Sequence, residues 1–120
     1  MTIFVIDDEP LFRRMAESTI RQAAPDAEKV SFSGPGLALS AIKGQKPDII
    51  FTDIDMPRMT GLELAQQMRR ADPGLRIVFV TGFTAHEVPN YNPPGKGLIL
   101  KPISVEAVRE ELKAASILRV

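Results

Sequence analysis

The chain contains no cysteine among its 120 residues, which excludes disulfide bonds and any metal site built from thiolates. It has no apolar run long enough to cross a bilayer, and its first residues lack the basic segment that opens a signal peptide. Neither sign of charge is in excess, because 15 basic and 15 acidic side chains cancel, so the whole chain shows no electrostatic signature of nucleic-acid binding. The default expectation is a cytoplasmic protein without membrane or nucleic-acid partners.

Apolar runs alternate with amphipathic patterns along the chain, whose length is a common size for one domain, here 1–120. The apolar runs predict strands at 2–7, 29–33, 48–53, 76–81 and 97–101. The amphipathic patterns predict helices at 9–23, 36–44, 60–71 and 104–116. Strands that alternate with helices favour βαβ units, and right-handed crossovers then give an α/β fold with a doubly wound parallel sheet.

The ends and faces of two helices can be predicted in more detail. Pro10 suits the first turn of the first helix, and Asp8 is the expected cap. Ser104 is the expected cap of the last helix, although Ala107 stands where a Glu or Gln would complete a capping box. The face of the first helix that is expected to point inward carries Leu11, Phe12, Met15, Thr19, Ile20 and Ala23.

The fourth crossover departs from this pattern. Residues 82–96 contain Pro89, Pro93 and Pro94, and an interior proline costs a helix about 3 kcal/mol. We therefore expect the fourth helix to be missing or irregular. His86, the only histidine, falls in this segment and is interpreted as a loop residue.

Polar side chains stand at the carboxyl ends of four predicted strands. The first strand ends in Asp7 and Asp8, the third in Asp53, the fourth in Thr81 and the fifth in Lys101. The carboxyl ends of parallel strands share one edge of the sheet, so these side chains are expected to converge in one crevice. Clustered carboxylates suit a hard cation such as Mg²⁺, and a lysine with a hydroxyl beside it suits a phosphoryl group.

Each of these residues also has an ordinary interpretation. The acid pair fits a solvated helix start, Thr81 a strand former, Lys101 a surface lysine and Asp55 a loop residue. Those separate interpretations explain the whole arrangement poorly. It consists of an acid pair, an acid, a hydroxyl and a lysine, each at a strand end and in this order.

Four stretches resemble the bacterial response-regulator receiver domain: FVIDDEP, PDIIFTDIDMPRMTGLEL, VFVTG and LKPI. The resemblance covers residues 2 to about 115. It implies a flavodoxin-like sheet with strand order 2-1-3-4-5. It also implies a phosphorylatable switch of a two-component system, which accepts a phosphoryl group from a histidine kinase or phosphotransfer protein. Such a switch would act on a downstream protein by contact or by phosphorelay, and would not be a conventional enzyme.

The resemblance assigns a role to each acidic residue of the crevice. Asp53 would be the phosphoacceptor. Asp8 and Asp53 would hold Mg²⁺ directly, together with the backbone carbonyl of Asp55, whereas Asp7 would act mostly through water. The chemistry agrees, since a carboxylate is a competent nucleophile for phosphoryl transfer.

The resemblance also assigns roles to residues outside the acidic set. Thr81 and Lys101 would bind phosphoryl oxygens. Pro102 would shape the turn after the lysine, in this family often through a cis bond, and Gly61 would begin the third helix.

Two features depart from the common receiver pattern. Leu98 stands where many receivers carry an aromatic residue whose rotation reports phosphorylation, and 82–96 replaces the usual fourth helix. With its TGF motif the chain resembles a subset of receivers that occur as single-domain regulators and in hybrid kinases.

Two other functions are compatible with parts of the sequence. Haloacid dehalogenase-like phosphatases use a similar DxD motif, with Asp55 as the general acid, but Pro57 stands where Thr or Val is expected and the motif belongs on their first strand. The other alternative is a docking module that works without phosphorylation. It would keep the fold but have no need of the crevice residues.

Overall fold

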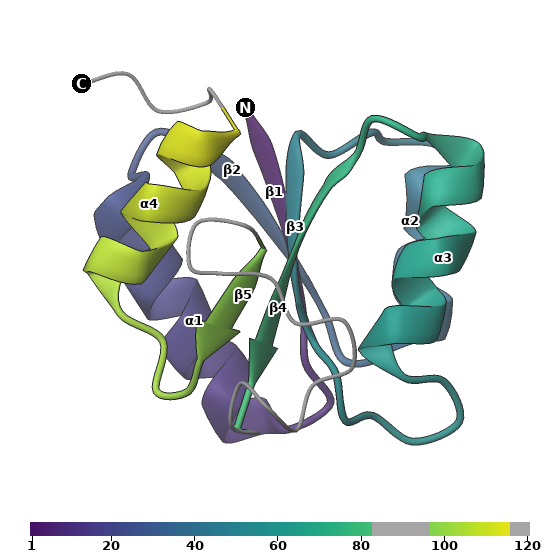
Figure 1. Cartoon of the computed structure of the whole chain (residues 1–120), viewed down its shortest axis with the longest axis horizontal. Helices are drawn as coiled ribbons and strands as arrows, with labels where there is room; N and C mark the ends of the chain where they lie inside the picture. Colours follow the sequence, from purple (N-terminus) through teal and green to yellow (C-terminus); the bar gives the residue numbers. More distant parts are fainter. Residues whose placement is uncertain (83–96, 116–120) are drawn as a thin grey trace.

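The computed structural model describes residues 1–82 and 97–115, which form a sheet between two layers of helices (Figure 1). The described strands are β1 (Thr2–Ile6), β2 (Glu28–Phe32), β3 (Ile49–Asp53), β4 (Arg76–Thr81) and β5 (Leu98–Leu100). All neighbouring strands are parallel, in the order β2-β1-β3-β4-β5. This confirms the predicted doubly wound, flavodoxin-like α/β fold.

Each face of the sheet is covered by one pair of the described helices. They are α1 (Pro10–Ala23), α2 (Pro35–Ile42), α3 (Gly61–Ala71) and α4 (Val105–Ala114). Helices α1 and α4 lie on one face, and α2 and α3 lie on the other (Figure 1). None of the described helices is long and apolar enough to span a membrane. Of the segment 82–96 that is predicted to be irregular, residues 83–96 lie outside the described residues.

The core has two halves because successive strand residues point to opposite faces of the sheet. On the α1 and α4 side the strands contribute Ile3, Val5, Ile49, Phe51, Val78 and Val80. On the α2 and α3 side they contribute Phe4, Ile6, Ile50 and Ile77. The central strand β3 is buried along its whole length, which explains its unbroken apolar start.

The structure corrects two predictions about the first helix. The cap is Glu9 and not Asp8, because the Glu9 carboxylate accepts a hydrogen bond of 3.2 Å from the Leu11 amide. The predicted inward face is also wrong at its start, since Leu11, Phe12 and Met15 are exposed. These residues lie in the first turns of α1, beside the carboxyl edge of the sheet. The residues of α1 that are buried against the sheet are Ala16, Ile20 and Ala23.

Other helix ends agree more closely with the sequence. Ser104 caps α4 by accepting a hydrogen bond of 3.1 Å from the Ala107 amide, as predicted. Helix α3 begins at Gly61, also as expected, behind a capping box formed by Thr60 and Glu63 that the sequence reading had not identified.

Gly61 brings the start of α3 directly against the end of β3. Its amide donates a hydrogen bond of 2.8 Å to the Ile54 carbonyl. A Cβ atom at this position would run into the backbone carbonyl of Asp53. Only glycine therefore allows the helix to begin here without displacing the end of the central strand.

Replacing Gly61 by alanine is expected to lower the free energy of unfolding by about 3 kcal/mol, because the new methyl group meets fixed backbone. Urea unfolding measures the change. Gly36→Ala is the matched control, since Gly36 lies in α2 with open space around its Cβ position. The control should change stability by less than about 1 kcal/mol, in the stabilising direction. Equal effects of the two substitutions would contradict the steric argument.

Candidate functional site

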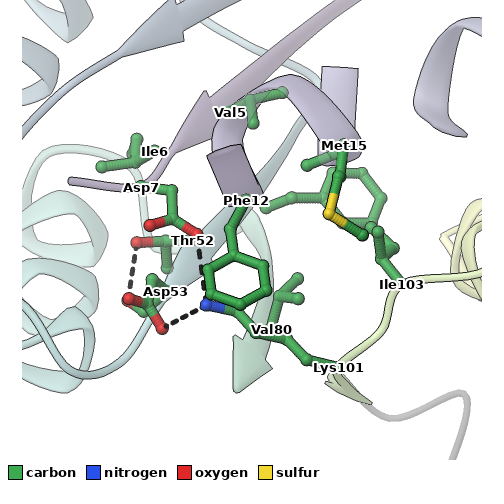
Figure 2. A pocket seen from close by; sticks show the side chains of 12 residues that line it. Val5, Ile6, Asp7, Phe12, Met15, Thr52, Asp53, Val80, Lys101 and Ile103 are labelled. Atoms are coloured by element: carbon green, nitrogen blue, oxygen red, sulfur yellow. Dashed lines mark hydrogen bonds and ion pairs between the residues drawn. The ribbon is translucent and has the colours of Figure 1, made fainter. Parts of the chain in front are cut away.

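Three charged side chains from three strand ends meet at the carboxyl edge of the sheet (Figure 2). Asp7 follows β1, Asp53 ends β3 and Lys101 follows β5. The Lys101 ammonium lies 3.3 Å from Asp7 Oδ2 and 3.5 Å from Asp53 Oδ1. All three are largely withdrawn from solvent, with exposures of 4% for Asp7, 6% for Asp53 and 15% for the Lys101 side chain. The predicted convergence at one sheet edge is therefore observed for these residues.

Asp8 adds a third carboxylate to the group. Asp7, Asp8 and Asp53 each offer an oxygen, and these oxygens lie within 4.8 Å of one another. Burial, followed by the negative charge of Asp7, raises the pKa of the Asp53 carboxyl above its ordinary value. Lys101 and the Ile54 amide oppose this shift without cancelling it. Three carboxylates here lie beside the single positive charge of Lys101, and their hard oxygen donors fit a divalent cation such as Mg²⁺.

Backbone groups and neighbouring side chains hold the two buried aspartates in place. Asp7 Oδ1 accepts a hydrogen bond of 2.9 Å from the Glu9 amide, and the Asp7 carbonyl accepts one of 2.8 Å from Arg13 Nη1. Asp53 Oδ1 accepts one of 2.9 Å from the Ile54 amide. The Thr52 hydroxyl donates one of 3.0 Å to the Asp53 carbonyl. Both carboxylates therefore have defined orientations.

Thr81 and Lys101 belong to adjacent strand ends. The Lys101 amide donates a hydrogen bond of 2.8 Å to the Thr81 carbonyl, and the Lys101–Pro102 peptide bond is cis, as the family resemblance suggested. Thr81 is buried, with 1% of its surface exposed, whereas Asp55 is exposed. An open cleft brings these residues together, since its lining includes Asp8, Asp53, Asp55, Thr81 and Lys101. Asp7 lines the adjoining pocket.

Two residues of the first helix lie at the site in addition to those that the sequence predicts there. Arg13 holds the Asp7 carbonyl. Phe12, which the helical pattern predicts on the core face, has its ring centroid 4.2 Å from Lys101 Nζ. Helical side chains point back toward the amino end of their helix, and α1 begins at the site, so its first turn covers the crevice. In the sequence, the indication of this placement is that both residues follow closely after Asp7 and Asp8.

The raised pKa of Asp53 gives a pH-dependent stability difference. With divalent cations chelated, Asp53→Asn should be more stable than the unchanged chain near pH 7, because it removes a buried charge beside Asp7. The gain should shrink as the pH falls toward the unfolded pKa of about 3.9, where the wild-type carboxyl is also neutral. Urea unfolding at about pH 7 and about pH 4 measures it. Asp26→Asn, at an exposed position, is the control; a gain for Asp53→Asn that does not change with pH would contradict the charge argument.

A family model described as the response regulator receiver domain matches residues 3–113. Among curated relatives, the probable transcriptional regulatory protein TcrX of Mycobacterium tuberculosis is 30% identical over 117 residues, covering 95% of this chain and 49% of that protein. The positive alginate biosynthesis regulatory protein of Pseudomonas aeruginosa is 31% identical over 119 residues, covering 97% and 47%. The chain thus spans about half the length of these relatives.

Solved structures show the same fold. An uncharacterized protein from Neptuniibacter caesariensis superposes with a TM-score of 0.81 at 25% identity, covering 97% of this chain and 87% of that one. The response regulator TrrA from Thermotoga maritima, in complex with Mg²⁺ and BeF, superposes with a TM-score of 0.79 at 22% identity, covering 95% and 97%. The family match, supported by the strand order and the acidic edge of the sheet, shows that this chain belongs to the receiver domain family of two-component response regulators.

Proposed function

We propose that the chain, as one receiver domain over 1–120, is a phosphorylatable switch whose phosphoacceptor is Asp53. The observation that carries this assignment is the place of Asp53 beside two further carboxylates in the open cleft that Thr81 and Lys101 also line, since Asp7 does not line that cleft. Asp53 ends the third strand of the chain, whereas a dehalogenase-like phosphatase would carry its motif on the first strand. The exposed Asp55 has a peripheral place at the cleft, which suits a carbonyl ligand better than a nucleophile.

The donor set supports Mg²⁺ as the cofactor. Asp8 and Asp53, with the backbone carbonyl of Asp55, would hold the cation directly. Asp7 would act mostly through water, because its two carboxylate oxygens are already engaged by the Glu9 amide and by Lys101. When bound, the cation neutralises the crowded carboxylates and the charge of an incoming phosphoryl group.

The transfer step follows from the position of Asp53. Among the described residues, the polar contacts of its carboxylate both involve Oδ1, so we assign the attack on phosphorus to Oδ2. The new bond joins this oxygen to phosphorus. The phosphorus–nitrogen bond of the donor's phosphohistidine breaks, and the imidazole nitrogen keeps the electron pair and takes up a proton. Lys101 and Thr81 would bind the transferred oxygens, through a point charge and a hydroxyl respectively.

The partners follow from this chemistry. A histidine kinase or a phosphotransfer protein in the cytoplasm would supply the phosphoryl group, and the domain would assist its own phosphorylation and dephosphorylation. The phosphoryl group brings about −1.5 to −2 of charge to the crevice. Because esterification removes the charge of the Asp53 carboxylate, the net gain is about −0.5 to −1. A downstream protein would read this change by contact, or would receive the phosphoryl group in a relay.

Leu98 limits how the change is transmitted. It is buried and clusters with Ile54, the residue after the phosphoacceptor, while Leu62 and Phe79 pack against them. A leucine has no hydroxyl for a hydrogen bond, so its part in transmission is packing against Ile54. An aromatic rotation at this position is not available to the chain.

Substitution of Asp53, which ends β3, and of Asp55, which follows it, tests the nucleophile. Asp53→Asn should abolish incorporation of acid-stable, hydroxylamine-sensitive phosphate from labelled acetyl phosphate, because the amide is not a nucleophile for phosphorus. Asp55→Asn should keep incorporation and change only its rate, because the proposed ligand there is the backbone carbonyl. Labelling of the Asp53 variant together with an unlabelled Asp55 variant would show that the assignment is wrong.

Calorimetric titration with Mg²⁺ tests the metal site. The unchanged chain should bind weakly, and Asp8→Ala should remove the binding, because Asp8 is one of the carboxylates proposed to hold the cation directly. Asp26→Ala is the matched control, since this exposed aspartate precedes β2 at the opposite edge of the sheet. Equal Mg²⁺ affinity in the Asp8 and Asp26 variants would argue against the proposed coordination.

A further inference from the structure

The Lys101 ammonium has an aromatic neighbour as well as two acidic ones (Figure 2). Its nitrogen lies 4.2 Å from the centroid of the Phe12 ring, within the range of a cation–π interaction. The ring comes from the first turn of α1, whereas the carboxylates belong to the ends of β1 and β3. Three separate elements therefore surround one nitrogen atom.

The carboxylates alone do not define the position of this ammonium. The distances of 3.3 Å to Asp7 and 3.5 Å to Asp53 exceed the 2.7–2.9 Å that is typical of charge-assisted hydrogen bonds. They attract the charge without fixing its place. The aromatic ring supplies a third restraint from another direction, and it shields that side of the nitrogen from water.

Core packing does not account for the location of Phe12. Its exposed fraction is 38%, whereas Phe4 and Phe51 are exposed by 0% and 1%. Helix α1 packs on the sheet through residues further along its length, beginning with the buried Ala16. A large apolar side chain is thus left half in solvent, against the lysine of the site.

We propose that Phe12 is a positioning residue for Lys101, an inference that rests on the proposed function. The ring face holds the ammonium over the crevice while the lysine shifts from the two carboxylates to the incoming phosphoryl oxygens. Esterification removes the charge of the Asp53 carboxylate, so one of the two acidic attractions is lost as the reaction proceeds. The ring is unchanged by the reaction, and it carries no net charge that would compete with the phosphoryl group for the lysine.

Graded fluorination of the Phe12 ring in the full chain tests this role. Fluorine withdraws electron density from the ring face and weakens a cation–π interaction with little change in shape. Phenylalanine analogues with one, two and three fluorines at position 12 should slow phosphorylation by acetyl phosphate with Mg²⁺ in steps. The decrease should total about fivefold to tenfold, with the logarithm of the rate constant falling linearly with fluorine number. Phe12→Trp should preserve the rate, and Phe12→Leu should lower it to the level of the trifluorinated chain.

The same fluorinated series at Phe32 is the matched control. This ring packs edge-on against Phe4, with centroids 4.9 Å apart, and it lines neither the open cleft nor the adjoining pocket. Its series should leave the rate constant unchanged. In the unmodified and unphosphorylated chain, the ring current of Phe12 should shift the ε-methylene proton resonances of Lys101 upfield, and Phe12→Leu should remove that shift.

The outcomes separate this inference from the function on which it rests. A phosphorylated chain whose rate does not depend on fluorination at position 12, or falls equally in the Phe32 series, would overturn the role of Phe12 alone. Absence of the ring-current shift would overturn the contact. Failure of the unchanged chain to incorporate phosphate would overturn the proposed function and the role of Phe12 together.

Discussion

Electrostatic repulsion between carboxylates at one edge of the sheet is the constraint on which the rest of this structure depends. Asp7 and Asp53 are buried side by side, and Asp8 lies within reach of both. Burial, followed by the charge of Asp7, raises the pKa of Asp53, and the attraction of Lys101 offsets this rise only in part. The folded chain therefore holds a site that a divalent cation would stabilise, and the fold has to supply the free energy that keeps the site together without one.

The fold meets this cost by fixing the backbone on both sides of the crevice. Gly61 lets α3 start against the Asp53 carbonyl, so that the end of β3 cannot move away. At the opposite end of β5, the buried Glu111 of α4 accepts a hydrogen bond of 3.0 Å from the Gly97 amide and forms an ion pair of 2.8 Å with Arg76. This contact anchors the strand that leads to Lys101. The strand ends that carry the charged groups are thus held by the close approach of Gly61 to β3 and by the contacts of Glu111 with Gly97 and Arg76.

The helix above the crevice has two functions that compete for its residues. Ala16 and Ile20 bury the middle of α1 in the core, where apolar area is the main source of stability. The first turn lies beside the site, where Arg13 holds the Asp7 carbonyl and Phe12 faces Lys101. Phe12 is an apolar residue that lies outside the core and contacts the Lys101 ammonium. The same amphipathic pattern therefore serves packing at one end of the helix and the site at the other.

The sequence by itself determined the alternation of strands and helices, and with it the convergence of Asp7, Asp53, Thr81 and Lys101, because parallel strands always bring their carboxyl ends to one edge. Tertiary structure decided what depends on approach between distant elements. Phe12 and Ile20 look alike in a helical pattern, and only the position of α1 over the sheet separates a residue of the site from a residue of the core. Arg58, in the loop between β3 and α3, has a φ of 72°, which is uncommon for a residue other than glycine. The residue type gives no indication of this conformation, which belongs to the folded loop. Local patterns encode the elements, whereas the contacts of each side chain are set by how those elements pack.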